Sequence, residues 1–596
     1  MNHNQENRHP LRKAFSVLLI LTLLSMPSWI LASEQGDRFK EIYEKEWQFR
    51  LQEFPTLASA SGDEDAARDL GHFSQKDEER RNQYWKGIKQ ELSEISCEQL
   101  DRDECINFRL YSKQIEDYLA EFESNSYLIP FNSDWGFYMS WGMLPGDTDF
   151  NKSEDYEKYL ERIQKIGVVM DEYIEQMRQG IKMGYTQPRV ILDGRDEPIK
   201  TQLVDKVEDS PFYAPFKGLS ESMGSGDRAE LLSAAQQVIS EDVIPAYQRF
   251  YDFFHQEYVP GARETVGAYH LPNGKAFYQS KIKKYATVDM TPQEIHDIGL
   301  SEVARIRSEM DAIIEEVQFE GDFEAFLEFL RTDPQFYAKT PKELLAFASY
   351  YAKKADGRLP MLFGHLPRQP YGVAPVPDEI APFFTGGRYV GAPLDAHRGG
   401  YYWVNTYALE SRTLYTIPAL TLHEGAPGHH TQIALAAELD NQPDFRRNDY
   451  ISAYGEGWGL YAEKLGVEMD IYETPYEHFG RLTYEMWRAC RLVIDTGVHA
   501  MGWTRQQALD YLSGNTALSM HEVTTEIDRY ISWPGQALSY KLGEYTIWQL
   551  RHEAEQALGD DFDVRDFHDF VLGLGSVTLD ILKDEVKSWI RQQSNA

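Results

Sequence analysis

Apolar side chains recur every three or four residues over most of this 596-residue chain, which is the spacing of amphipathic α-helices. Thr291, Pro292 and Glu294 predict the start of one helix, and Ile295–Ile314 supplies its body. With 42% hydrophobic residues, the chain can bury a large core. We therefore expect a mainly α protein. A second such run near the N-terminus comprises Phe39, Ile42, Tyr43, Trp47, Leu51 and Phe54.

One segment departs from the helical pattern. Roughly Leu359–Asp395 contains seven prolines and five glycines in irregular order, which excludes a continuous helix there. The aromatic and β-branched run Tyr401–Tyr407 then predicts a strand, and helical spacing resumes at Arg412. These patterns predict a mainly helical body with a small β-sheet.

The charge and the cysteine content limit which partners and cofactors are possible. The chain has 95 Asp and Glu against 60 Lys and Arg, a formal net charge of −35, which predicts no nucleic-acid partner. Its three cysteines exclude a thiolate zinc ribbon, so any zinc must be held by histidine and carboxylate. Cys97 and Cys105 can pair in an oxidising compartment or remain free thiols.

The N-terminus has the order of a secretory signal. Three basic residues precede the apolar run Ala14–Met26, and the small residues Ala32 and Ser33 follow. We predict that residues 1–33 form a signal peptide and that the mature protein is periplasmic or secreted, without stable membrane insertion. An uncleaved anchor is the alternative, because the apolar segment approaches the ~20 residues that span a bilayer.

A histidine-glutamate cluster is the most informative motif. His423, Glu424, His429 and His430 fall within eight positions. Zinc hydrolases use two histidines on one helix face, a glutamate beside the first as base, and a more distant carboxylate ligand. A helix turn with surface histidines is the alternative, but the clustering favours a Zn²⁺ site.

The spacing within this cluster leaves the second ligand open. In an unbroken helix, His429 lies ~240° round from His423, whereas His430 lies on the same face but ~10 Å away. Pro427 cannot donate to the carbonyl of His423, and Gly428 relaxes the backbone restrictions. A local break can therefore bring one of the two imidazoles back beside His423.

A third ligand must come from elsewhere in the chain. Glu456 lies between Gly455 and Gly457, which leave space around its carboxylate. Glu463 lies seven residues later on roughly the same helical face. We predict that Glu456 binds the metal and that Glu463 either orients a histidine or is an ordinary surface acid.

These motifs resemble the DUF885 family of exported bacterial proteins. The matching segments are His423-Glu424…Pro427-Gly428-His429-His430…Gln432, Glu456-Gly457-Trp458…Leu460-Tyr461-Ala462-Glu463, Arg491-Leu492-Val493…Asp495-Thr496-Gly497…His499, Glu526…Arg529-Tyr530…Pro534-Gly535-Gln536-Ala537…Tyr540…Gly543, Ile295-His296…Gly299 and Phe567-His568…Leu572.

The resemblance implies a fold similar to helical zinc peptidases of the oligopeptidase and carboxypeptidase Taq kinds. Residues 34–596 would then form a single zincin-like domain, with two lobes around a deep central cleft and the small sheet beside the metal helix. It implies that His429, in a Gly-His pair, is the second ligand; His430 is the competing assignment.

The resulting hypothesis is zinc-dependent hydrolysis of a peptide substrate, with Glu424 as general base. By likeness to related peptidases, Tyr540 is the candidate donor to the oxyanion, unless it is only a packed helix residue. Arg529 is a candidate for holding a substrate carboxylate, although it can equally pair with Glu526 on its own helix.

The predicted strand at 401–407 suggests a way to hold the peptide. An extended substrate can pair with a strand, so Tyr402 and Asn405 are candidate substrate contacts. Two other functions stay open: a zinc-containing peptide-binding or scaffold protein without catalysis, and an amidase or isopeptidase acting on another amide. Bond preference and oligomeric state have no sequence signal.

Overall fold

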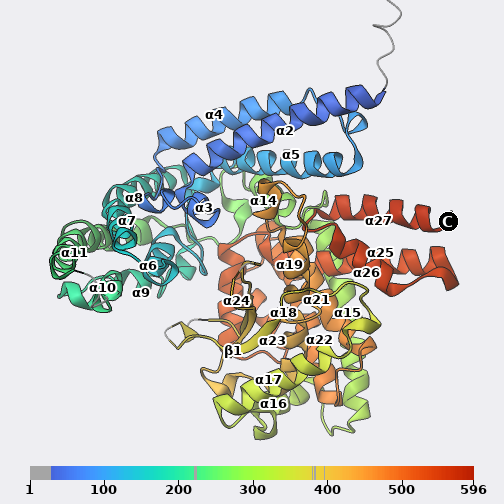
Figure 1. Ribbon diagram of the computed structural model, residues 1–596. Coiled ribbons are helices and arrows are strands. Elements are labelled where there is room, and N and C mark those ends of the chain that lie inside the picture. Colours follow the sequence, from blue (N-terminus) through green and yellow to red (C-terminus); the bar gives the residue numbers. More distant parts are fainter. Residues whose placement is uncertain (1–27, 220–223, 379, 382–383, 395, 596) are drawn as a thin grey trace, which may run out of the picture.

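The computed structural model describes residues 28–219, 224–378, 380–381, 384–394 and 396–595, and it is mainly helical with one small sheet (Figure 1). Of the predicted signal peptide, residues 1–33, the first 27 lie outside the described residues. Over the described ranges, no helix combines the length and the hydrophobicity needed to span a bilayer. The mainly α class predicted from the apolar spacing is confirmed.

Three N-terminal helices lie side by side along one end of the molecule (Figure 1). They are α2 (Ser28–Glu53), α4 (Gln75–Leu92) and α5 (Arg102–Glu123). Phe39, Ile42 and Trp47 are buried, as their spacing predicts, and join one apolar core with the C-terminal helices. A Cys97–Cys105 disulfide links the first turn of α5 to the segment before it, so the pairing left open by the sequence is present.

A second group of helices lies to one side of this layer (Figure 1). It comprises α3 (Pro55–Ala60), α6 (Phe137–Asp147), α7 (Ser153–Gln164), α8 (Ile166–Met183), α9 (Glu197–Lys200), α10 (Ala214–Lys217), α11 (Ser225–Val238), α12 (Ile244–Phe253) and α13 (Val259–Gly261). Aromatic residues dominate its interior, which is continuous with the core around the C-terminal helices.

The rest of the chain forms the body that carries the site. Its helices are α14 (Gly274–Tyr285), α15 (Pro292–Glu316), α16 (Phe323–Thr332), α17 (Pro341–Asp356), α18 (Ile417–Glu424), α19 (His429–Ala437), α20 (Asp444–Arg447), α21 (Ser452–Glu468), α22 (Pro475–Ala500), α23 (Arg505–Asn515), α24 (Met520–Ser532), α25 (Ser539–Leu558), α26 (Val564–Gly573) and α27 (Leu579–Gln593). The predicted start of α15 is confirmed: the Thr291 hydroxyl accepts from the Glu294 amide in a capping box.

Two of these helices cross with almost no space between their backbones. A Cβ placed on Gly457 of α21 would lie 2.5 Å from the Cα of Gly543 in α25. A side chain at either position would force the helices apart. The close contact fixes α21, which carries Glu456 and Glu463, against α25, which carries Tyr540.

The small sheet has three strands in the order β1-β3-β2. β1 (Tyr371–Pro375) pairs in parallel with β3 (Gly400–Val404), and β2 (Gly387–Val390) pairs antiparallel with the other edge of β3. The strand predicted at 401–407 is present but ends at Val404. Because β3 is central and both of its edges are occupied, it cannot pair with a substrate; the expectation that it does so is wrong.

Two buried histidines tie helices together. The Nδ1 atom of His499 on α22 accepts from the Ala268 amide, and its Nε2 donates to the Tyr530 carbonyl. His568 on α26 is equally buried. Burial lowers the pKa of each imidazole to about 3, so both are neutral in the folded protein.

These histidines predict a loss of stability in acid. In the unfolded chain each has a pKa of about 6.5, so the unfolded state takes up the extra protons as the pH falls from about 6.5 towards 3. Each histidine then removes about 1.4 kcal/mol per pH unit over that range. Thermal unfolding measured from pH 7 to pH 4 should show this loss. Exchange of the exposed His521 for glutamine should leave the profile unchanged; a flat profile for the native chain would contradict the prediction.

Candidate metal centre

A break between two helices shapes the histidine cluster. α18 ends at Glu424 and α19 begins at His429, with a cis Ala426–Pro427 peptide between them. A Cβ on Gly428 would lie 2.0 Å from the carbonyl oxygen of His423, so only glycine permits the chain to return this closely. The Trp458 indole N–H holds the turn by donating to the Pro427 carbonyl at 2.9 Å. The break predicted at Pro427-Gly428 is therefore present.

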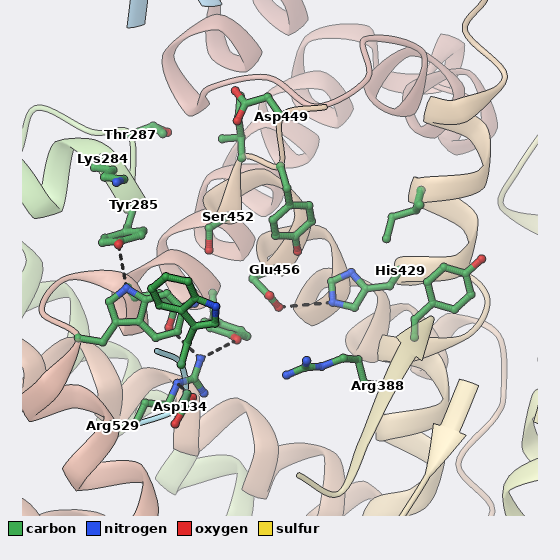
Figure 2. A pocket seen from close by; sticks show the side chains of 18 of the residues that line it. Asp134, Lys284, Tyr285, Thr287, Arg388, His429, Asp449, Ser452, Glu456 and Arg529 are labelled. Atoms are coloured by element: carbon green, nitrogen blue, oxygen red, sulfur yellow. Dashed lines mark hydrogen bonds and ion pairs between the residues drawn. The ribbon is translucent and has the colours of Figure 1, made fainter. Parts of the chain in front are cut away.

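Two imidazoles and one carboxylate converge on a single point; Figure 2 shows two of these groups, His429 and Glu456, facing each other. The Nε2 atoms of His423 and His429 lie 3.6 and 3.4 Å from Oε2 of Glu456, which is provided by α21. All three donor atoms lie within 4.8 Å of one another. Ligands of a tetrahedral zinc ion, with bonds of ~2.0–2.1 Å, are separated by about 3.3–3.4 Å, so these residues fit Zn²⁺.

A second carboxylate orients the first imidazole. Oε1 of Glu463, one of the most deeply buried carboxylates, lies 2.8 Å from Nδ1 of His423. Burial alone would lower the pKa of His423, but Glu456 and Glu463 outweigh it and raise the pKa to about 10. Burial would likewise raise the pKa of Glu456, yet the two imidazoles hold it well below its usual range. Glu463 thus occupies the orienting position predicted for it.

His430 points away from this group. Its Nδ1 lies 3.0 Å from the hydroxyl of Tyr389, and its ring packs against Tyr371. Burial lowers its pKa to about 4, so it is neutral. The geometry places His429, and not His430, beside Glu456.

Glu424 lies beside His423, His429 and Glu456, the three residues of the candidate metal group, and is held by the sheet. Its Oε2 accepts the backbone N–H of Tyr389 in β2 at 2.7 Å. Because this amide points to Glu424, the peptide groups of Tyr389 face away from β3, along the free edge of the sheet. Glu424 and β2 both border a cavity of about 980 Å³ that also contains His423, His429 and Glu456.

Arg529 and Tyr540 both line this cavity, and Figure 2 shows Arg529 on the side opposite His429. The Arg529 guanidinium donates to Gln536 at 2.9 Å and to the Tyr540 hydroxyl at 3.4 Å. It also forms ion pairs with Glu526, 3.5 Å away, and with Asp134, 3.2 Å away. Arg529 therefore pairs with Glu526 and faces the cavity at the same time.

Tyr402 and Asn405 are not placed to contact a substrate in this cavity. Both are 0% exposed and neither borders it. Tyr402 faces inward from the central strand, while the Asn405 amide donates to three backbone carbonyls of the 381–385 segment. Their assignment as substrate contacts is wrong, because the aromatic pattern identified the strand but not its position in the sheet.

Several residues of the cavity wall were missed by the sequence reasoning. They are Arg388, Tyr389, Tyr450, Arg488 and Arg491. Two arginines three residues apart within the otherwise apolar stretch of α22 were the one available signal, since charges on a buried helix face need a partner. The contribution of β2 has no comparable signal, because it lies in the irregular proline-rich segment.

Gly459 provides a test of the metal geometry. A Cβ at this position would lie 2.8 Å from both Cε1 and Nε2 of His423, so Gly459→Ala should push the ring away from Glu456. We expect zinc affinity to fall about 10–100-fold, the usual effect of disturbing the support of a ligand. Competition titration with a chelator measures it. Gly573→Ala, where an added Cβ meets no atom within 4 Å, is the control. Equal zinc affinity in both variants would contradict the placement of His423.

Comparisons with known proteins agree on the fold. A crystal structure described as that of "the putative lipoprotein from Colwellia psychrerythraea" is similar, with a TM-score of 0.84 and 28% identity, and the match covers 95% of this chain and 100% of that one. A Shewanella oneidensis structure, "a putative lipoprotein of unknown function", shares the fold, with a TM-score of 0.72, 17% identity and coverage of 92% and 99%.

A search of curated proteins finds no match. The family described as "Bacterial protein of unknown function (DUF885)" matches residues 55–586. This range includes the metal group, Glu424 and the arginines of the cavity wall. The chain therefore belongs to the DUF885 family.

Proposed function

We propose that this protein is an exported zinc-dependent peptidase that hydrolyses peptide amide bonds with Glu424 as general base. The observation that carries the proposal is the convergence of His423, His429 and Glu456 beside Glu424 in one cavity of about 980 Å³. A cavity of this size is adequate for several residues of a peptide.

The ligand set supports a catalytic role over a structural one. Structural zinc sites are closed by four protein ligands, whereas catalytic sites have three and keep one position open. Among the described residues, the group contains three, His423, His429 and Glu456. A Zn²⁺ ion held there would supply Lewis-acid chemistry and lower the pKa of water towards neutrality.

The protein's own groups can move the proton. One oxygen of Glu424 is fixed by the Tyr389 amide, so the carboxylate has a defined orientation at the cavity wall. Glu424 can then take a proton from the attacking water and deliver it to the leaving amine. The Tyr540 hydroxyl, across the cavity, is the candidate donor to the developing oxyanion.

The edge of β2 can hold the substrate backbone. The Tyr389 N–H is occupied by Glu424, but the Tyr389 carbonyl lies on the same side of the strand, so an extended peptide can donate to it and add as an outer strand. This replaces the pairing expected for the 401–407 segment. The likeness to helical zinc peptidases, with a zincin-like fold around a cleft, is part of this proposal.

Three observations support export. The N-terminal residue order is that of a secretory signal, and the Cys97–Cys105 disulfide suits an oxidising compartment. In addition, each of the two similar solved structures is described as that of a "putative lipoprotein".

Metal analysis combined with a cleavage screen tests the function. We expect one zinc ion per purified chain, cleavage within a diverse peptide library, loss of cleavage after chelation and recovery when zinc is returned. Protein that takes up no ion at this site after zinc is supplied would overturn the proposal. Zinc-loaded protein that cleaves no peptide would instead indicate a binding or scaffold protein, and cleavage of non-peptide amides alone would indicate an amidase.

A further inference from the structure

A cationic wall faces the cavity in a protein whose formal net charge is −35. α22 provides Arg488 and Arg491, and α24 provides Arg529. Arg491 is 1% exposed and Arg488 is 5% exposed. Buried guanidinium groups are costly unless each is paired with a carboxylate, so the pairing of this wall is informative.

The pairing of Arg491 is incomplete. Its Nη2 donates to Glu526 at 2.8 Å and its Nε donates to the Tyr530 hydroxyl at 2.9 Å. Its Nη1 is buried and has no hydrogen-bond partner within the part of the chain that the structure describes. Glu526 is also shared, because Arg529 lies 3.5 Å from its other oxygen. Arg529 has a second carboxylate partner in Asp134, 3.2 Å away, whereas Glu526 is the single carboxylate that pairs with Arg491 among the described residues.

Arg488 has even weaker pairing. Its nearest carboxylate is Glu463, 3.9 Å away, and Glu463 already accepts from His423. Its Nη1 donates to the Tyr484 carbonyl at 3.4 Å. Its Nε is buried and, among the described residues, unpartnered. Glu463 therefore lies between Arg488 and His423, and the Nε donor of Arg488 has no partner among the described residues.

Aromatic rings hold the two guanidinium groups in place. The guanidinium carbon of Arg488 lies 4.2 Å from the centre of the Trp487 ring. The corresponding carbon of Arg491 lies 4.6 Å from the same ring and 4.3 Å from the centre of the Tyr540 ring. Stacked guanidinium groups lose little freedom when their edges bind a planar anion, and carboxylate fits that geometry.

We infer that Arg491 and Arg488 form a subsite for a carboxylate group of the substrate. The inference rests on the proposed function, since it takes the substrate to be a peptide in the same cavity as Glu424 and the metal group. A peptide has two sources of this chemistry, its free C-terminus and an Asp or Glu side chain. A bound carboxylate would supply the missing partner for Nη1 of Arg491 and a nearer anion for Arg488, whose carboxylate neighbour Glu463 is 3.9 Å away.

Binding to a non-turning-over protein tests the subsite. Zinc-loaded full-length protein carrying Glu424→Gln is titrated with dansyl-labelled Ala-Ala-Ala as free acid and as C-terminal amide. A second pair, the amides of dansyl-Ala-Glu-Ala and dansyl-Ala-Gln-Ala, isolates the side-chain carboxylate. In at least one pair, the form with the carboxylate should bind at least about tenfold more tightly.

Further substitutions in the Glu424→Gln protein test whether the carboxylate preference depends on the arginines of the cationic wall. Arg491→Gln should abolish the discrimination within the pair, and Arg491→Lys should restore part of it. Arg488→Gln should reduce it. Arg505→Gln, which removes a guanidinium paired with Asp528 away from the cavity, is the control and should leave it unchanged. Zinc content and circular dichroism show whether each variant is folded.

The outcomes separate this inference from the proposed function. Equal binding within both pairs, or a preference that survives in the folded Arg488→Gln/Arg491→Gln double variant, overturns the subsite while peptide cleavage stands. If the native protein cleaves no peptide but the carboxylate preference is present and is lost with Arg491, the subsite stands and the peptidase proposal fails.

Discussion

Exchange of Glu424 for glutamine should reduce peptide turnover by about 10²–10⁴-fold, the contribution of a positioned general base. Glutamine is isosteric and its amide oxygen can still accept the Tyr389 N–H, so the local structure should persist. Glutamine cannot take the proton of the attacking water. The initial rate of peptide cleavage at saturating substrate is the measurement.

Metal content provides the control for this variant. Zinc stoichiometry should equal that of the native chain, since Glu424 is not one of the three converging donors. Glu438→Gln, at a carboxylate that pairs with Arg368 on the outside of the body, should retain native turnover. Glu424→Gln with native turnover would remove this residue from the chemistry even if zinc is bound.

The second large effect should distinguish two neighbouring histidines. His429→Ala removes one of the three donors that converge on the metal position, so zinc affinity should fall on the order of 10²–10³-fold, about a quarter of the free energy of a four-coordinate zinc site. Peptide turnover at limiting zinc should fall with it. Equilibrium titration against a zinc chelator gives the affinity.

His430→Ala is the matched variant, one residue away and equally buried. It removes the hydrogen bond to Tyr389 and leaves the donor set complete, so zinc affinity should remain close to native. Both variants lose a buried ring, and the thermal midpoint of each measures that common cost. Loss of zinc from His430→Ala and retention by His429→Ala would reverse the ligand assignment.

Local sequence patterns were sufficient to predict most of the helices. The run beginning at Phe39 predicts α2, and the Thr291 capping box predicts the start of α15, because capping and apolar periodicity act within a few residues. The strand at β3 was also predictable from its aromatic residues. Its neighbours were not, because strand order depends on contacts between segments that are distant in sequence.

The metal group could be predicted in composition but not in geometry. Helical arithmetic places neither His429 nor His430 beside His423, so the sequence could not choose between them. The choice depends on how tightly the chain returns at Gly428, whose Cα packs against the carbonyl of His423. The bond from the Trp458 indole to the Pro427 carbonyl, across two elements, completes that turn.

The cationic wall shows a different limit of prediction from the sequence. Arg488 and Arg491 are visible in the sequence as charges in an apolar stretch of a long helix, but their partners come from α21 and α24. Whether such a charge is neutralised depends on those tertiary contacts. Only the structure shows that one nitrogen of each guanidinium has no partner among the described residues.

The hydrogen bond between Glu424 and Tyr389 involves the main chain of β2 and no side chain. Every residue except proline has this N–H, so position 389 can change its side chain without deleting the hydrogen bond to Glu424. Replacement of the Tyr389 side chain can therefore change the surroundings of His430, while the hydrogen bond that orients Glu424 is preserved. Proline at 389 is the one replacement that deletes the donor, so it would release Glu424 through the main chain alone.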